Sequence, residues 1–207
     1  SLLWGVLVSR LGDWRPSHAA CIFDYSGRTF RTEIFDGYKA NRSAPDEDLR
    51  PQFALCRAAS AAFGIPAIEE PGFEADDLIA TYAGMAEDSG AETVVVTSDK
   101  DMMQIVTERT RLLLPPKGKD RDGNSLPWTF AGIQEVIDKF GVMPDQVPQV
   151  LAIAGDHTDN VPGVKGIGEK GASALIAQYR HIENIIMNYG LGKKEARVAE
   201  QAEDARM

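Results

Sequence analysis

The chain has 207 residues, of which 43% are apolar and 26% charged, and its formal net charge is −9. This composition excludes wholesale disorder and is typical of a soluble globular protein with one large or two small domains. The longest apolar run, residues 2–8, is far shorter than a membrane span, and no signal peptide is recognisable. We therefore expect no membrane partner.

Two cysteines, Cys21 and Cys56, are too few for a disulfide framework. Both lie in apolar patterns, which is typical of reduced thiols in a protein core. This cysteine usage predicts a cytoplasmic protein.

Hydrophobic periodicity predicts alternating helices and strands in the first part of the chain. Leucines at every fourth position predict an opening helix, and short β-branched runs predict buried strands. Strand, helix and strand in succession describe a parallel sheet built from right-handed crossover units. In chain order we predict a helix at 3–11, a strand at 19–23, a helix at 45–63, a strand at 66–69, a helix from the acidic triplet to 88, a strand at 93–97, a short helix at 102–106 and a strand at 112–114.

Three acidic residues, Glu74, Asp76 and Asp77, lie within four positions at the start of a predicted helix. Negative charge is favourable at a helix N-terminus, by about 1 kcal/mol at most for each residue, so the triplet has a purely structural explanation. Three carboxylates that repel one another at a half-buried position also favour a bound cation.

Further aspartates follow two predicted strands. Asp99 and Asp101 come directly after the β-branched run 93–97, and open α/β sheets keep their sites at the carboxyl ends of strands. Asp24 follows the strand at 19–23 in the same way, although an aspartate ahead of Ser26 and Gly27 can also simply form a turn. The pattern predicts a convergent set of cation ligands.

Basic residues are interleaved with aromatic ones at residues 28–31 and 38–42. This arrangement fits a surface that contacts phosphates and stacks one aromatic ring on a base. By composition alone the same residues also fit a solvated loop.

The segment at residues 115–124 is rich in turn-forming and charged residues, which predicts a domain boundary. We place an α/β domain at residues 1–125 and a helical region at residues 126–207. Pro148 must lie in the first turn of its helix, because proline breaks later turns. Helices are predicted around residues 133–140, 147–153 and 171–179, and a peripheral one after residue 192.

Glycines 163, 166 and 168 alternate with small apolar residues ahead of the helix at 171–179. The pattern predicts a tight hairpin between two helices. Its bare backbone amides, with a helix N-terminus behind them, would form a seat for a phosphate group. A plain structural turn is the alternative, but three glycines with two lysines in so short a stretch favour the phosphate interpretation.

With these motifs in place, the chain closely resembles the 5′-nuclease domain of bacterial DNA polymerase I and its flap-endonuclease relatives. Several ordered motifs at compatible spacing carry the resemblance, from residue 22 to about residue 179. The motifs are Ile22-Phe23-Asp24, Phe30-Arg31, Tyr38-Lys39-Ala40-Asn41-Arg42, residues 72–77, Ser98-Asp99-Lys100-Asp101 and residues 155–168.

The resemblance implies an α/β fold with a parallel-sheet, PIN-like nuclease core and a C-terminal helix-two-turn-helix region of the helix-hairpin-helix type. It also implies two divalent metal ions, Mg²⁺ or Mn²⁺, and in relatives the glycine hairpin can hold a K⁺ ion. The implied metal ligands are Asp24, Glu74, Asp76, Asp77, Asp99, Asp101, Asp156 and Asp159.

The resemblance further implies residues that bind DNA. Arg31, Lys39 and Arg42 match basic residues that engage the reacting phosphate or the 5′ end, and Tyr38 matches a residue that stacks on a base. The hairpin would grip the phosphates of the downstream duplex. Its implied DNA-binding residues are Gly163, Val164, Lys165, Gly166, Ile167, Gly168 and Lys170.

The chemistry of phosphodiester hydrolysis explains an all-carboxylate set. The reaction needs a hydroxide at neutral pH and relief of charge on the leaving oxygen, and two hard cations roughly 4 Å apart supply both. Hard cations select oxygen ligands. If eight carboxylates bind cations, 23 acidic residues remain against 22 basic ones, so the negative net charge does not exclude a nucleic-acid partner.

The chain departs from the family at its start. Relatives begin with a strand that ends in a further metal-binding aspartate, whereas this sequence opens on the predicted helix. Asp13 follows a helix end rather than a strand, so we do not assign that role to it. We expect that the first strand is missing here, and that a polymerase region follows in a longer protein.

The leading hypothesis is a structure-specific 5′ nuclease of replication and repair, a 5′-3′ exonuclease or flap endonuclease, located with the bacterial nucleoid. Its partner would be DNA with a 5′ flap, a nick or an RNA primer. One alternative is a DNA-binding relative without catalysis, motivated by the missing strand. The other is a PIN-like RNA nuclease, which shares the acidic pocket but would not need the glycine hairpin.

Overall fold

The structure, a computed structural model, describes residues 16–25, 27–44, 46–118, 123–124, 126–188, 190 and 192–204. The predicted opening helix at residues 3–11 and Asp13 lie outside the described residues. The chain divides into two compact units. The first comprises Ser1–Asp36 and Arg42–Tyr82, and the second comprises Gly37–Asn41 and Ala83–Met207.

In the first unit two short strands pair in parallel. β1 (Cys21–Ile22) lies beside β2 (Ala67–Ile68), and α4 (Arg50–Ala62) precedes β2 in the chain. After α4 the chain turns at Gly64, whose φ of +72° is a left-handed conformation that glycine adopts without strain. The predicted strand, helix and strand are confirmed, although both strands are shorter than predicted.

α3 (Phe30–Ile34) is a short helix where the composition also fitted a loop. The backbone N–H of Phe30 donates to the carbonyl of Gly72 at 3.0 Å, and the ring centroids of Phe30 and Phe73 lie 5.9 Å apart. These contacts join distant parts of the sequence, so no local pattern reveals them. The loop interpretation is wrong for Phe30 and Arg31.

α5 (Ala75–Asp88) starts at the acidic triplet, as predicted. It begins in the first unit, and the boundary between the two units falls within it. The helix ends ahead of Gly90, whose φ is +82°. The backbone N–H of Ala91 donates to the carbonyl of Ala86 at 2.9 Å and satisfies part of the helix end.

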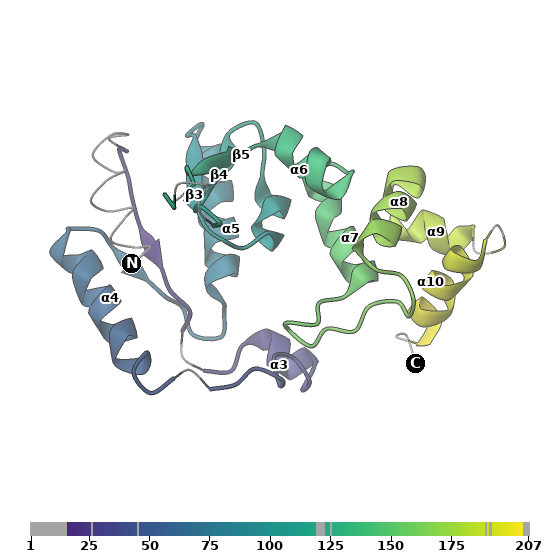
Figure 1. The fold of residues 1–207 in the computed structure, drawn as a ribbon, viewed down its shortest axis with the longest axis horizontal. Coiled ribbons are helices and arrows are strands. Elements are labelled where there is room, and N and C mark those ends of the chain that lie inside the picture. Colours follow the sequence, from purple (N-terminus) through teal and green to yellow (C-terminus); the bar gives the residue numbers. More distant parts are fainter. Residues whose placement is uncertain are drawn as a thin grey trace. The chain divides into compact units, whose positions relative to one another are not determined.

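The second unit contains a three-stranded sheet in the order β3-β4-β5 (Figure 1). β3 (Thr93–Val96) and β4 (Thr110–Leu114) are parallel, as predicted, and Leu112 and Leu113 on β4 are fully buried. Between the strands lies η1 (Asp101–Ile105), a 3-10 helix that buries Met102 and Met103. The β-branched and leucine-rich runs therefore form the core strands that the sequence predicts.

β5 (Thr129–Ala131) is a strand that the sequence analysis missed. It pairs antiparallel with β4, so that Leu112 lies opposite Ala131. Only helices were predicted beyond residue 125, and that expectation is wrong for these three residues. The run Thr-Phe-Ala is too short to show a periodicity of its own, and its pairing with β4 makes it a strand.

The second unit continues with helices (Figure 1). Val136 and Phe140, four residues apart, are buried on α6, and Val147 and Val150 are buried on α7. Pro148 is the second residue of α7, as predicted. The helices are α6 (Ile133–Phe140), the 3-10 turn η2 (Pro144–Gln146), α7 (Val147–Ala154), α8 (Glu169–Tyr179), α9 (Ile182–Met187) and α10 (Lys193–Asp204).

Three further predictions concern α10, the two cysteines and membrane-spanning helices. α10 is less peripheral than predicted, because Val198 and Ala199 are buried. Cys21 and Cys56 are free thiols, as predicted, but both are partly exposed rather than in the core. Within the described residues, no helix has the length and apolar character needed to span a membrane.

Candidate functional site

The first unit gathers four of the predicted ligands around the N-terminus of α5. Glu74, Asp76 and Asp77 occupy the start of the helix, and Asp24 follows β1. The Asp24 Oδ1 atom accepts a hydrogen bond from the backbone N–H of Ala75 at 2.8 Å. The first backbone N–H groups of a helix have no acceptor within the helix, and Asp24 supplies one for Ala75.

Asp77 is bound on both carboxylate oxygens. Its Oδ2 atom accepts from the backbone N–H of Glu74 at 2.9 Å, the reciprocal bond of a capping box. Both oxygens also accept from the guanidinium of Arg31, at 2.7 Å each. Arg31 lies 3.9 Å from Glu74 as well. Asp77 therefore has a structural role, with Arg31 as a cationic partner, and the metal-binding role of the cluster stays a prediction.

Arg57 on α4 positions Asp24, and the sequence analysis did not single it out. Its Nη2 atom donates to the backbone carbonyl of Asp24 at 3.1 Å. Its Nε atom donates to Glu69 at 2.8 Å, and its guanidinium lies 5.0 Å from the centroid of the Phe23 ring. A lone arginine on a helix gives no sequence signal for this role, because its partners follow two different strands.

The second unit gathers the other four predicted ligands. Asp99 and Asp101 follow β3, and Asp156 and Asp159 follow α7 at the start of the glycine hairpin. Asp99 Oδ1 accepts from the backbone N–H of Asp101 at 2.8 Å, and Asp156 Oδ1 accepts from that of Thr158 at 2.7 Å. These short turns fix the directions of the aspartates.

Negative charge is crowded around Asp101. Burial, and next the charge of Asp99, raise the pKa of Asp101 above its ordinary value of 3.8; Lys100 opposes the shift, and Asp156 and Asp159 add to it. The Oδ1 atom of Asp101 is buried and accepts no hydrogen bond from any described residue. A buried, unpartnered anionic oxygen among like charges is a position that a cation would stabilise.

The donor chemistry of both groups suits a hard divalent cation, because every candidate ligand is a carboxylate oxygen. The orphaned oxygen of Asp101 supports the same conclusion. Among the residues described, no group of three His, Cys, Asp or Glu side chains is close enough to hold one metal ion. Four candidate ligands lie in each unit, so a shared site for all eight stays a prediction.

The basic segment 37–41 lies against the loop that carries Asp159. The backbone N–H of Lys39 donates to the carbonyl of Asp159 at 2.8 Å, and Lys39 Nζ is 3.8 Å from Asp159 Oδ2. The Tyr38 hydroxyl donates to the same carboxylate oxygen at 3.2 Å. Two of the predicted DNA-binding side chains therefore meet a predicted metal ligand. Arg42 follows this segment and is exposed.

Two asparagines hold this segment in place. Asn41 Nδ2 donates to the carbonyl of His157 at 2.8 Å, and Asn160 Nδ2 donates to that of Gly37 at 2.7 Å. Lys39 and Asn160 both adopt positive φ, 55° and 57°. Left-handed residues other than glycine are uncommon and are held there by surrounding contacts. Asn41 lies within a predicted DNA-binding motif, but the sequence does not indicate its positioning role.

The glycine hairpin connects α7 and α8, as predicted. Asp156 and Val161 pair as an antiparallel bridge at its base. A Cβ atom on Gly163 would collide with the carbonyl of Ala154 and lie 2.5 Å from the nitrogen of Gly155. A Cβ atom on Gly155 would lie 2.7 Å from the Cα of Gly163. These two glycines therefore allow the backbone at Gly163 to pack directly against the backbone at the end of α7.

The hairpin presents two kinds of residue. The side chains of Val164 and Ile167 are buried, and their backbone N–H groups donate to the carbonyls of Ile153 and Val164 at 2.7 and 3.0 Å. They anchor the hairpin in the core. The remaining predicted DNA-binding residues of the hairpin, Lys165, Gly166, Gly168 and Lys170, are exposed, and Gly163 is partly exposed.

Lys100 connects the Asp99–Asp101 turn to the helix behind the hairpin. Its Nζ atom lies 2.8 Å from Glu169 Oε2, in the first turn of α8. This hydrogen bond, more than the charges of Asp101 and Asp156, raises the pKa of Lys100, while burial opposes the shift. The sequence does not reveal this partner, because Lys100 and Glu169 are 69 residues apart.

Two family models match the chain. Residues 3–141 match a family model described as "5′-3′ exonuclease, N-terminal resolvase-like domain", and residues 142–207 match "5′-3′ exonuclease, C-terminal SAM fold". The chain is 47% identical over 171 residues to a DNA polymerase I of Rhizobium leguminosarum, which covers 83% of this chain and 16% of that protein.

The chain is also similar to a separate exonuclease and to a solved endonuclease structure. A 5′-3′ exonuclease of Bacillus subtilis is 40% identical over 185 residues, 89% of this chain and 60% of that protein. A bacteriophage T5 flap endonuclease, solved as a complex with DNA and metal ions, superposes with a TM-score of 0.72 at 19% identity over 94% of this chain and 72% of that one. The predicted α/β fold with a C-terminal helical region is confirmed.

Proposed function

Since this chain belongs to the 5′-3′ exonuclease family, we propose that it is a metal-dependent nuclease that hydrolyses phosphodiesters in DNA with a 5′ flap, a nick or an RNA primer. The observation that carries the proposal is the crowding of carboxylates around Asp101, whose buried Oδ1 atom has no partner among the described residues. This cluster and the glycine hairpin belong to the same unit. A cation site next to a phosphate seat suits a nuclease better than a binding module.

We propose that two divalent ions, Mg²⁺ or Mn²⁺, bind the predicted carboxylates. Asp99, Asp101, Asp156 and Asp159 form one group, and Asp24, Glu74, Asp76 and Asp77 form the other. Asp77 suits a ligand role least, because both its oxygens already accept hydrogen bonds. When bound, such ions activate water and relieve charge on the leaving oxygen.

The chain's own cations would serve the substrate phosphate. Lys39 lies beside Asp159, so a phosphate at this carboxylate cluster would be within reach of an ammonium group. Tyr38 presents a ring next to it, with Lys39 Nζ 4.9 Å from the ring centroid. We assign Lys39, Arg42 and Arg31 to phosphate binding, and Tyr38 to stacking on a base.

The glycine hairpin would hold the duplex. Among the described residues, the backbone N–H groups of Gly166 and Gly168 donate no hydrogen bond, so both are available to phosphate oxygens. The DNA in the T5 endonuclease complex supports this role by likeness of fold. A K⁺ ion at the hairpin belongs to the same proposal.

The lengths of the relatives bear on the protein to which this chain belongs. The chain spans 16% of the Rhizobium polymerase I that it matches, and we propose that a polymerase region accompanies it in a longer bacterial protein that works on the nucleoid DNA in the cytoplasm. The domain division at residue 125 stays a prediction.

The test is cleavage of a 5′-labelled flap duplex. We expect flap release in Mg²⁺ or Mn²⁺ and none in excess EDTA. Equal release in EDTA would contradict metal-dependent catalysis. Binding of the flap in Ca²⁺ without cleavage in Mn²⁺ would instead identify a DNA-binding relative.

A second substrate distinguishes the proposed flap nuclease from a PIN-like RNA nuclease. Single-stranded RNA of the same length is incubated under the same conditions. Cleavage of the RNA in preference to the flap would favour an RNA nuclease of the PIN-like type.

A further inference from the structure

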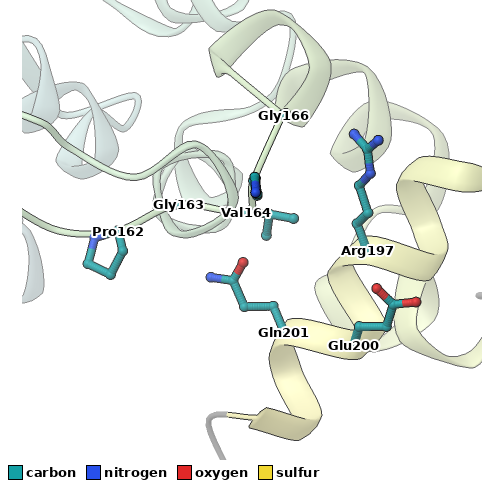
Figure 2. Close-up of a pocket in the computed structure, with 8 residues that line it drawn as sticks. Pro162, Gly163, Val164, Gly166, Arg197, Glu200 and Gln201 are labelled. Atoms are coloured by element: carbon teal, nitrogen blue, oxygen red, sulfur yellow. The ribbon is translucent and has the colours of Figure 1, made fainter.

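A groove lies between the glycine hairpin and α10, within the second unit (Figure 2). Its cavity volume is about 780 Å³. The hairpin lines one wall with Gly163 and Gly166, and α10 lines the other with Arg197, Glu200 and Gln201. Figure 2 shows the side chains of Arg197 and Gln201 extending from α10 toward the hairpin.

α10 is packed against the rest of the second unit. Val198 and Ala199 are 3% and 7% exposed, so its inner face is packed into the unit. The Tyr179 hydroxyl on α8 also donates to Glu195 Oε1 at 3.2 Å. Packing of this face fixes which residues of α10 point outward.

The outward residues place one cation beside the hairpin and a second beside the first turn of α8. Arg197 Nη1 lies 2.7 Å from the position of a Cβ atom on Gly166, and Lys194 Nζ lies 3.6 Å from that on Gly171. Lys194 and Arg197 are three residues apart, so they share one side of α10. Among the residues described, neither forms an ion pair within 4.0 Å.

The charge of the groove is positive. Arg197 and Lys165 line it, and Glu200 is its one acidic lining residue. A guanidinium binds a phosphate through two parallel hydrogen bonds, and an ammonium binds it as a point charge. The groove opens beside the backbone of Gly166, whose amide suits the same anion.

We propose that α10 is part of the DNA-binding surface, and that Arg197 and Lys194 bind the phosphate backbone of duplex DNA next to the hairpin. This inference rests on the proposed function, since it extends the duplex contact beyond the hairpin. The two cations would bind neighbouring phosphates, while Glu200 would repel the same strand and weaken the contact.

The test measures the affinity of the protein for a nicked duplex in EDTA over a series of salt concentrations. Arg197→Gln should weaken binding roughly tenfold at low salt. The slope of log K against log salt should become less steep by about 1, and Lys194→Gln should have a similar effect. Glu200→Gln should tighten binding, because it removes the repulsion and keeps the shape of the side chain.

Arg180→Gln is the matched control. Arg180 is also an exposed arginine, but it lies at the opposite end of α8 from the hairpin. We expect its affinity and salt slope to equal those of the unchanged protein. Thermal unfolding of each variant checks that the fold is retained, as expected for exposed side chains.

The outcomes separate this inference from the proposed function. If the protein binds and cleaves a flap, yet Arg197→Gln and Lys194→Gln keep full affinity and slope, the inference is wrong and the nuclease proposal stands. If nothing is cleaved but both variants weaken duplex binding, the inference stands alone. If the protein binds no duplex DNA, both are wrong.

Discussion

The guanidinium of Arg31 holds the carboxylate of Asp77 through two hydrogen bonds of 2.7 Å. The two residues come from α3 and from the first turn of α5, and both side chains are largely shielded from solvent, at 32% and 21% exposure. A residue predicted to bind phosphate and a residue predicted to bind metal therefore neutralise each other. The pair also fixes α3 against the start of α5.

We expect Arg31→Lys to lower the stability of the protein. Lysine cannot reproduce the two parallel hydrogen bonds, and the loss of about 1 kcal/mol corresponds to roughly 2–4 °C in Tm for a chain of this size. Thermal unfolding checks this. Arg28→Lys is the control, because Arg28 and Asp36 form an ion pair at 3.6 Å with side chains 75% and 95% exposed, and such pairs contribute little. Equal changes in Tm would contradict the role of the paired geometry.

Asp101→Asn should raise the Tm in EDTA and reduce the gain in Tm that Mn²⁺ produces. The first effect follows because asparagine removes a charge that burial and Asp99 disfavour. The second follows because a ligand that binds only the folded protein stabilises it, and the variant has lost a donor. Differential scanning fluorimetry with and without Mn²⁺ measures both. A variant that gains as much from Mn²⁺ as the unchanged protein would remove Asp101 from the metal site.

Glu108→Gln is the matched control for this experiment. It also removes one carboxylate, at an exposed position in the turn before β4. We expect its Tm to change little under either condition.

The stability that Asp101 contributes should depend on pH in a defined direction. Because its pKa is raised in the folded protein, the folded state holds this proton more tightly than the unfolded chain does. The contribution is present below the ordinary value of 3.8 and is lost as the pH rises through the raised pKa. In EDTA, Asp101→Asn should therefore gain stability relative to the unchanged protein as the pH rises from about 3. Urea unfolding at several pH values measures it, and a gap that narrows with rising pH would contradict the shift.

Two glycines of the hairpin should respond differently to alanine. Gly163→Ala places a methyl group against the backbone of Ala154 and Gly155, so we expect a loss of more than about 2 kcal/mol. Gly168 has nothing within 4 Å of a Cβ atom and a φ of −90°, so Gly168→Ala should keep its stability. Its added methyl group should instead weaken duplex binding. Chemical unfolding and fluorescence anisotropy with a nicked duplex separate the two effects.

Local patterns determined most elements of this protein. Spacing of apolar residues located α4, α5, α6, α7 and α8. A β-branched run located β3 and a leucine run located β4, because a helix or a buried strand repeats its contacts every few residues. The same reasoning located the aspartates at the strand ends and the hairpin between α7 and α8. These features depend on neighbours in the sequence.

The tertiary structure alone decided what those residues touch. Nothing near Asp77 in the sequence reveals Arg31, and nothing near Gly163 shows that its missing side chain serves packing against Ala154. By sequence the cations of α10 belong to an ordinary charged helix, and only the structure places Arg197 beside Gly166. Such roles arise from contacts between segments far apart in the chain, and a pattern of neighbouring residues carries no record of them.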